Sequence, residues 1–334
     1  MFLIFIFCLL LNFLFLINFD KIVKIINIYD HPDNIRKQHK SKIPPIGGLI
    51  IILNLLIFFL FHFFNNSLFL SEYFINNRGI YSFFIPLLAF FILGLYDDKY
   101  GISSSLKLIL FSIIIFFAIN LDQNLIISKV SLSFFRDIEL RELSSFFTVI
   151  CFVLFINALN MFDGINLQVG SYVTFIIIIL LINNVYTNVN ILVLISLFLY
   201  LYLNYKNKIY LGDNGAYLLG YYISYIFIKT YNNENIFLAD EVFLIMLIPG
   251  IDLLRLAIER SVKGKHPFSA DRQHIHHLIL DNSNLTSAYL YLQLLIIIPY
   301  LLSYFIPVIY CLILGILAYL LIFSYFRSTN KIIY

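Results

Sequence analysis

The stretch Leu93-Gly94-Leu95-Tyr96-Asp97-Asp98-Lys99-Tyr100-Gly101 closes a run of sixteen uncharged residues, 80–95. In a chain this apolar, such a run is typical of a membrane span. The two adjacent carboxylates repel each other, and placing them beside lipid adds a desolvation cost. A bound divalent cation or a transferred proton would explain why that cost is accepted. The alternative is that Asp97 and Asp98 only end a helix at the water interface.

The composition indicates a membrane protein. Of the 334 residues, 61% are hydrophobic and 12% are charged, whereas soluble domains carry about 25% charged residues. We therefore expect an all-α, polytopic integral membrane protein in which residues 1–334 form a single transmembrane domain. The net charge of +3 is too small to indicate a nucleic-acid partner. Cys8, Cys151 and Cys311 lie within apolar runs and predict neither a disulfide nor a metal site.

The apolar runs predict eleven spans. One span needs ~20 residues, so the two runs of 42 residues are each expected to hold two spans. The first run has neither a basic start nor a cleavage site and is expected to be a retained span. The predicted spans lie near 2–19, 46–64, 80–95, 106–120, 144–160, 170–183, 190–204, 215–230, 240–257, 286–304 and 307–326.

The distribution of Lys and Arg predicts the orientation. With the N-terminus outside and the C-terminus in the cytoplasm, the inside segments hold 17 of these cations and the outside segments hold 5. Cytoplasmic loops are the ones enriched in Lys and Arg. The chain is therefore expected to be a multi-pass protein of the cytoplasmic (inner) membrane, with Asp97-Asp98 inside. The segment 122–143 is expected to form a short extended or interfacial piece outside.

The first two inside loops carry cations next to constrained backbone. Loop 30–48 ends in Pro44-Pro45-Ile46-Gly47-Gly48, where glycine permits close approach of a helix or a ligand. Its lysines could meet a phosphate or simply anchor the chain. In the second loop, Ser103-Ser104-Ser105 can cap the following helix. Lys107, just inside that helix, can reach headgroup height, and plain snorkelling is the alternative.

The third and fourth inside loops carry carboxylates and amides. Asn157 and Asn160 share one helix face and reach toward Asp163, a set that suits a metal or a nucleoside, or merely caps the helix. Asp213 lies between two glycines, so a cation could approach it without obstruction. Alone, the pattern Gly-Asp-x-Gly is a weak turn signal.

The fifth inside loop is rich in histidine. Residues 266–277 hold four of the seven histidines, beside Arg272. Arginine and neutral histidine offer hydrogen-bond donors at many angles, which favours binding of phosphate and sugar hydroxyls. Zinc is the alternative ligand. No cysteine accompanies the cluster, and His274-x-His276-His277 alone does not give a closed tetrahedral set.

These five loops, in this order, resemble the polyprenyl-phosphate N-acetylhexosamine-1-phosphate transferase family (glycosyltransferase family 4 type) over about residues 30–280. The histidine motif is similar to that of the bacterial undecaprenyl-phosphate N-acetylglucosamine-1-phosphate branch. The peptidoglycan branch, phospho-N-acetylmuramoyl-pentapeptide transferase, has a different histidine loop and is the alternative enzyme. The matching motifs are Pro44-x-x-Gly47-Gly48, Asp97-Asp98, Asn157-x-x-Asn160-x-x-Asp163-Gly164, Gly212-Asp213-x-Gly215 and the run from Pro267 to His277.

The sequence departs from the family pattern at two places. Gly101 stands where the family often has a third Asp, and Asn166-Leu167-Gln168 stands where it often has Asp-Gly-Leu. The second departure bears on the identity of the sugar.

The resemblance implies a reaction. The phosphate of undecaprenyl (polyprenyl) phosphate would attack the β-phosphorus of a UDP-N-acetylhexosamine and release UMP, initiating synthesis of a cell-envelope polysaccharide such as O-antigen. The resemblance implies Mg²⁺ or Mn²⁺ as cofactor, contacts with membrane lipid, and allows a homodimer. The implied residues are Asp97, Asp98 and Lys107 for catalysis; Asp213 and Asn160 for the metal; Asn157, Asp163 and Asn166 for the nucleotide; and Arg272, His274, His276 and His277 for the sugar phosphate.

A cation- or proton-coupled transporter is the alternative from another functional class, because acidic residues in polytopic proteins often relay protons. Transporters place such residues near the middle of the membrane. Here the five motifs are predicted to lie at one face, which favours the transferase.

Overall fold

The computed structural model describes residues 2–30, 42–65, 77–234, 236–267 and 272–333. The predicted phosphate-binding cations of the first loop at 36, 37 and 40, and positions 269 and 271 of the histidine motif, lie outside the described residues. The helices are α1 (Phe2–Ile17), α2 (Phe19–Ile26), α3 (Gly47–Asn65), α4 (Asn77–Tyr100), α5 (Ser104–Leu121), α6 (Ser144–Phe162), α7 (Gln168–Ile182), α8 (Thr187–Tyr205), α9 (Gly212–Glu234), α10 (Ala239–Ile245), α11 (Leu247–Val262), α12 (Ile275–Asn282), α13 (Leu285–Leu302) and α14 (Val308–Ile333).

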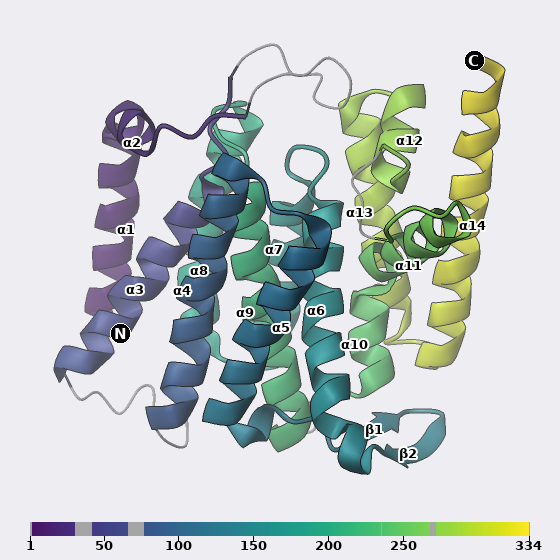
Figure 1. Ribbon diagram of the computed structural model, residues 1–334, viewed down its shortest axis with the longest axis horizontal. Helices are drawn as coiled ribbons and strands as arrows, with labels where there is room; N and C mark the ends of the chain where they lie inside the picture. The colour runs from purple at the N-terminus through teal and green to yellow at the C-terminus, as the bar shows by residue number, and fades with distance from the viewer. Residues whose placement is uncertain (1, 31–41, 66–76, 235, 268–271, 334) are drawn as a thin grey trace.

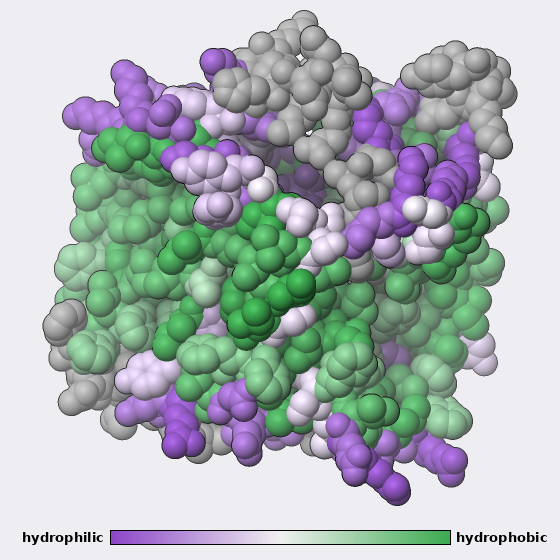
Figure 2. All heavy atoms as spheres, in the orientation of Figure 1, coloured by the Kyte–Doolittle hydropathy of each residue, from purple (hydrophilic) through white to green (hydrophobic). Residues whose placement is uncertain are grey.

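The long helices lie side by side in one bundle, as Figure 1 shows. On the face shown in Figure 2, hydrophobic residues form a band across the middle of the bundle, and hydrophilic residues lie at both ends. Over the described residues, six helices are long and apolar enough to cross a membrane, and the bent pair α1–α2, which turns by 75°, would be a seventh. The predicted all-α, multi-pass membrane architecture is confirmed, whereas the predicted count of eleven spans is not confirmed.

The predicted span 240–257 is wrong as a single helix, because the chain breaks at Met246 into α10 and α11. Pro249 has no N–H and cannot donate to the carbonyl of Ile245 four residues earlier. That carbonyl accepts a hydrogen bond from the Tyr172 hydroxyl instead, at 3.1 Å. A proline and a tyrosine from another helix together account for the break.

Helix α9 occupies the centre of the bundle and packs against α3, α4 and α6. Residues 214–230 of α9 are all buried. Its tyrosine hydroxyls find partners on neighbouring helices: Tyr221 donates to the carbonyl of Ser82 at 2.5 Å, and Tyr222 donates to Asn190 Oδ1 at 2.7 Å. A buried hydroxyl without a partner would be costly, so these bonds orient α9 relative to α4 and α8.

The backbones of α4 and α9 come unusually close at Gly94. A Cβ atom at this position would overlap the backbone of Asn214. Small residues permit such close approach between membrane helices. Gly94 therefore sets the distance between the end of α4 that carries Asp97-Asp98 and the start of α9.

The segment 122–143 forms an antiparallel hairpin of β1 (Lys129–Leu132) and β2 (Phe135–Glu139), flanked by short 3-10 helices at Gln123–Leu125 and Arg141–Leu143. The hairpin lies at the opposite end of the bundle from α2 and α12 (Figure 1). The backbone N–H of Ser133 donates to Asp240 Oδ1 at 3.0 Å, which ties the hairpin to α10. The predicted extended piece is thereby confirmed as structure.

The contact at Gly94 yields a stability prediction. Gly94→Ala is expected to lower the free energy of unfolding by about 1–3 kcal/mol, because the added methyl group meets the α9 backbone. Gly250→Ala is the matched control, since no atom lies within 4 Å of a Cβ there. Alanine is also the better helix former, so the control should be neutral or stabilising. Thermal unfolding of the two purified variants in detergent checks this, and equal midpoints would contradict it.

Candidate active site

Asp98 caps the start of α9 from another helix. Its carboxylate accepts hydrogen bonds from the backbone N–H of Asp213 at 2.9 Å and of Asn214 at 3.1 Å. It also accepts from Asn214 Nδ2 at 2.6 Å. The first N–H groups of a helix lack partners within the helix, and a negative charge is favoured there. Asp98 therefore joins the end of α4 to the start of α9.

The neighbouring carboxylate, Asp97, faces a different set of groups. The Lys107 ammonium lies 2.5 Å from Asp97 Oδ2 and 4.0 Å from Asp213 Oδ2. The Tyr217 hydroxyl donates to Asp97 Oδ2 at 2.5 Å, and Asn160 Nδ2 donates to Asp213 Oδ1 at 2.5 Å. The structure thus gathers Asp97, Lys107, Asp213 and Asn160, which were predicted from three inside loops, into one group joined by ion pairs and hydrogen bonds. Ser103 caps α5 as predicted, accepting from the N–H of Leu106 at 3.4 Å.

The proline–glycine motif of the first loop packs against the start of α9, beside Asp98. The carbonyl of Pro45 accepts from Asn214 Nδ2 at 2.5 Å, and the N–H of Gly47 donates to the carbonyl of Tyr210 at 2.9 Å. Gly212 has φ +75°, and a Cβ there would crowd Pro45 and Asp98. Glycine is therefore required where the chain turns into α9.

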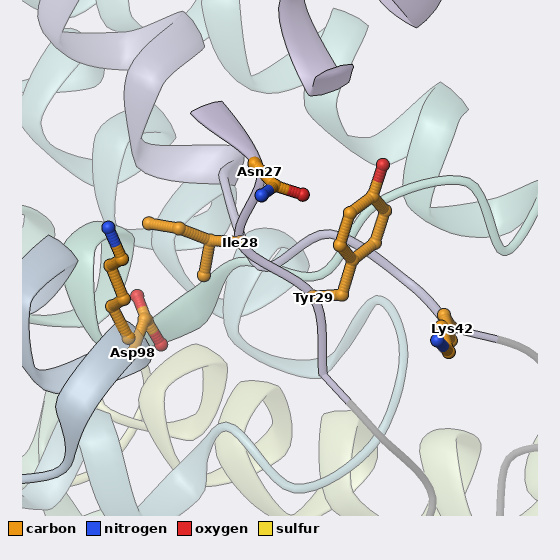
Figure 3. Close-up of a pocket in the computed structure, with 6 residues that line it drawn as sticks. Asn27, Ile28, Tyr29, Lys42 and Asp98 are labelled. Carbon is orange, nitrogen blue, oxygen red and sulfur yellow. The ribbon is translucent and has the colours of Figure 1, made fainter. Parts of the chain in front are cut away.

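A cavity of about 690 Å³ opens beside the acid pair. Figure 3 shows it between Asp98 at the end of α4 and the segment that follows α2. Its lining residues are Asn27, Ile28, Tyr29, Lys42, Asp98 and Lys99. Two lysines in one cavity wall give a positive surface that suits a phosphate group.

The third loop and the histidine loop meet at Gly164. The His276 ring lies so close to Gly164 that a Cβ there would overlap it. Burial, together with the nearby charge of Asp213, raises the pKa of Asp163 to about 7. His276 is 1% exposed, and burial lowers the pKa of its imidazole. Its Nδ1 has no hydrogen-bond partner among the described residues. A carboxyl group and a neutral imidazole therefore flank this glycine.

Other predicted site residues make local contacts. Asn157 donates to the carbonyl of Val153 in its own helix at 2.8 Å. Asn166 donates to Asn207 Oδ1 at 2.5 Å, and Arg272 donates to Asp281 Oδ1 at 2.8 Å. The roles assigned to Asn157, Asn166 and Arg272 remain predictions.

Two residues of the site were missed by sequence reasoning. Tyr217 binds Asp97, and Asp252 of α11 accepts from His274 Nδ1 at 2.8 Å. Asp252 lies inside a predicted span, three residues before Arg255 and seven before Glu259. This charge spacing along one helix face was the available signal.

The residues present fit an open magnesium site. Asp213 and Asn160 supply hard oxygen atoms, and Mg²⁺ is often held by one or two carboxylates, water and substrate phosphates. Over the described residues, no three His, Cys, Asp or Glu side chains stand together as a metal site. In the zinc alternative His274 would be a ligand, but its Nδ1 faces Asp252 at 2.8 Å and its Nε2 lies 3.4 Å from Arg260 Nη2, so both ring nitrogens already have partners in the protein.

Comparison with known proteins agrees with this geometry. Residues 80–231 match the family model "Glycosyl transferase family 4". This range contains the end of α4 with Asp97-Asp98, the end of α6 before Asp163, and the start of α9 with Asp213. An undecaprenyl-phosphate alpha-N-acetylglucosaminyl 1-phosphate transferase from Escherichia coli O157:H7 is 29% identical over 280 residues, 80% of this chain and 73% of the relative. Proteins of the same name from Salmonella typhi and Thermotoga maritima are each 27% identical, over 76% and 75% of this chain and 70% and 72% of the relatives. The family resemblance predicted from the five loops is confirmed.

The raised pKa of Asp163 gives a pH prediction. Between about pH 4 and pH 7 the folded chain holds a proton on this carboxyl that the unfolded chain has released. Stability from this group is therefore present at low pH and is lost as the pH rises through 7. Asp163→Asn, which cannot ionise, should therefore melt at least about 2 °C above the unmodified chain at pH 8.5. This shift corresponds to a gain in the free energy of unfolding on the order of 1 kcal/mol. The gap should shrink as the pH falls from 7 and should close below about pH 4.

Melting temperatures of both chains across this pH range make the measurement. Asp137→Asn, in the exposed hairpin, serves as a control for loss of one carboxylate. Curves for Asp163→Asn and the unmodified chain that stay parallel would contradict the prediction.

Proposed function

We propose that this multi-pass membrane phosphosugar transferase moves N-acetylglucosamine 1-phosphate from a UDP-sugar onto undecaprenyl or another polyprenyl phosphate. The products would be a polyprenyl-diphosphate sugar and UMP. The names of the three relatives support this choice of acceptor and sugar. The positive-inside count supports a site at the cytoplasmic face of the inner membrane.

The observation that carries the proposal is the group formed by Asp97, Lys107, Asp213 and Asn160. It lies where the ends of α4, α5, α6 and α9 meet, so one lysine neutralises two carboxylates at the rim of the bundle. The phosphate of a membrane lipid must arrive at such a rim. A transporter would place these groups near mid-membrane.

In the proposed reaction, the lipid phosphate replaces UMP on the β-phosphorus of the UDP-sugar. An oxygen of the lipid phosphate forms a bond to the β-phosphorus, and the bond from that phosphorus to the bridging oxygen breaks. UMP leaves with the bridging oxygen and the electron pair. A phosphate monoester has its second pKa near ~6, so the attacking oxygen is already ionised and catalysis rests on alignment and charge neutralisation.

The chain's own groups have distinct tasks in this scheme. Lys107 binds the lipid phosphate, because its ammonium has three N–H donors and the two carboxylates that it faces leave a donor for a phosphate oxygen. Asp97 holds Lys107 in place. When bound at Asp213 and Asn160, Mg²⁺ would supply charge neutralisation for the diphosphate. Asp163 faces the nucleoside, and His276 with His277 faces the sugar phosphate.

Product analysis tests the function directly. Membranes containing the protein are offered a panel of UDP-sugars, and the lipid products are identified by mass spectrometry. A polyprenyl diphosphate carrying one N-acetylhexosamine, with UMP released in equal amount, supports the proposal. Release of UMP without a lipid product would contradict it, as would no turnover with any UDP-N-acetylhexosamine.

The assigned metal ligand gives a mutational prediction. Asp213→Asn keeps the side-chain shape but removes the charge, and it should lower kcat by about 10²–10³, as expected when a charged group that stabilises the transition state is lost. Asp137→Asn removes a carboxylate from the exposed hairpin at the other end of the bundle and should turn over normally. UMP release per mole of folded protein is the measurement. Near-normal turnover of Asp213→Asn at saturating Mg²⁺ would remove Asp213 from the site.

Metal removal gives a second prediction. EDTA should abolish turnover, and Mg²⁺ or Mn²⁺ should restore it, because the proposed ligands are hard oxygens. Restoration by Zn²⁺ alone would favour the histidine-zinc alternative and contradict the assignment to Asp213 and Asn160. Turnover that is insensitive to EDTA would leave Lys107 as the cation that neutralises the diphosphate.

A further inference from the structure

One buried carboxylate ties the histidine loop to the C-terminal helix. Asp252 is 2% exposed, and its Oδ2 lies 2.8 Å from His274 Nδ1. Its Oδ1 accepts from the backbone N–H of Ile275 at 3.2 Å and from the Tyr319 hydroxyl of α14 at 2.8 Å. Hydrogen bonds to a buried carboxylate are among the strong ones. The loop and α14 are therefore held by the same side chain.

Arg255 reinforces this link. Its Nη2 donates to Asp252 Oδ1 at 2.7 Å and to the carbonyl of Gln273 at 2.8 Å. Its Nε donates to the Tyr319 hydroxyl at 2.8 Å, and its guanidinium carbon lies 4.3 Å from the centroid of the Phe323 ring. The planar guanidinium thus bridges α11, α14 and the histidine loop.

His274 has both ring nitrogens engaged within the protein. Nδ1 faces Asp252, and Nε2 lies 3.4 Å from Arg260 Nη2. A guanidinium only donates, so Nε2 accepts and the ring proton stays on Nδ1. The ring stacks on that of His276, with centroids 5.2 Å apart and an angle of 13° between the planes. His276 in turn lies against Gly164.

We propose that Asp252 and Tyr319 are positioning residues, through which α14 and the ring of His274 hold His276 against the Asp163-Gly164 turn. We call this chain of contacts, from Tyr319 through Asp252 and His274, the clamp. It changes the predicted role of His274 from binding the sugar phosphate to holding its neighbour. The effect of the clamp on donor binding rests on the proposed function, whereas the clamp itself does not.

Removing a single hydroxyl tests the clamp. Tyr319→Phe keeps the ring and removes one hydrogen bond to Asp252, so the KM for UDP-N-acetylglucosamine should rise about three- to tenfold, with a smaller change in kcat. The inhibition constant for UMP, which lacks the sugar, should stay the same. Tyr325→Phe is the matched control on the same helix, where the side chain is 62% exposed. A Tyr319→Phe variant with the KM of the control would overturn the proposal.

Two substitutions of His274 separate positioning from contact with the donor. In His274→Asn an amide N–H can take the place of Nδ1–H and still bind Asp252, whereas His274→Ala has no donor. The KM for UDP-N-acetylglucosamine should therefore rise less in His274→Asn than in His274→Ala. Equal losses in both would mean that the imidazole Nε2 itself touches the donor, and would overturn the role given to His274.

A measurement without substrate keeps the two proposals apart. Amide hydrogen exchange of residues 272–282 should be faster in Tyr319→Phe and Asp252→Asn than in Tyr325→Phe. Tyr319→Phe alone suffices if Asp252→Asn does not fold. Unchanged exchange overturns the clamp. Faster exchange in a chain that turns over no UDP-sugar supports the clamp and contradicts the proposed function.

Discussion

The site depends on the carboxylate of Asp98 bound to the first turn of α9. Through it the C-terminal end of α4 meets the N-terminal end of α9, where the helix dipole favours a negative charge. Adjacent residues on a helix point in different directions. Asp98 binds the first turn of α9, whereas Asp97 faces Lys107 of α5 and Tyr217, one turn further along α9. The two carboxylates at this helix end therefore have different partners: Asp98 binds backbone N–H groups, and Asp97 binds an ammonium and a hydroxyl.

Much of the architecture could be predicted, because apolar runs and glycine-flanked acids are local patterns. The apolar runs predicted the hydrophobic segments, and the resemblance of the inside loops to a known family placed Asp97, Lys107, Asn160 and Asp213 in one expected site. The sequence could not divide the tasks of Asp97 and Asp98, since that depends on how α4 is rotated against α9. Asp252 was missed for the same reason: its partners, His274 and Tyr319, are 22 and 67 residues away in the chain. The break at Met246 needed Tyr172, from a third helix, to accommodate the free carbonyl beside Pro249.

The two sides of the site are held by different means. On the α4–α9 side, glycines let backbones approach and amide groups fill the remaining contacts, as Asn214 does between Asp98 and Pro45. On the α11–α14 side, charged groups carry the contacts: Glu259 accepts from Arg255 at 3.1 Å and from Arg327 at 3.0 Å. The Arg327 side chain is 45% exposed, whereas the pair of Asp252 with Arg255 is largely buried and fixes geometry at a desolvation cost. The first arrangement fixes distances between backbones, and the second fixes side-chain directions.

The tyrosines of α9 have a consequence for biogenesis. α9 is central in the bundle, yet it is not among the six helices apolar enough to be recognised as a span by composition. A helix with so many hydroxyl and amide groups has little affinity for lipid alone. We expect α9 to enter the bilayer together with α4 and α8, whose Ser82 and Asn190 already offer partners for its hydroxyls. Insertion of the middle of the chain would then be a concerted step. The polar groups of α4 and α8, which are synthesised earlier, would bind the hydroxyl groups of α9 in place of water.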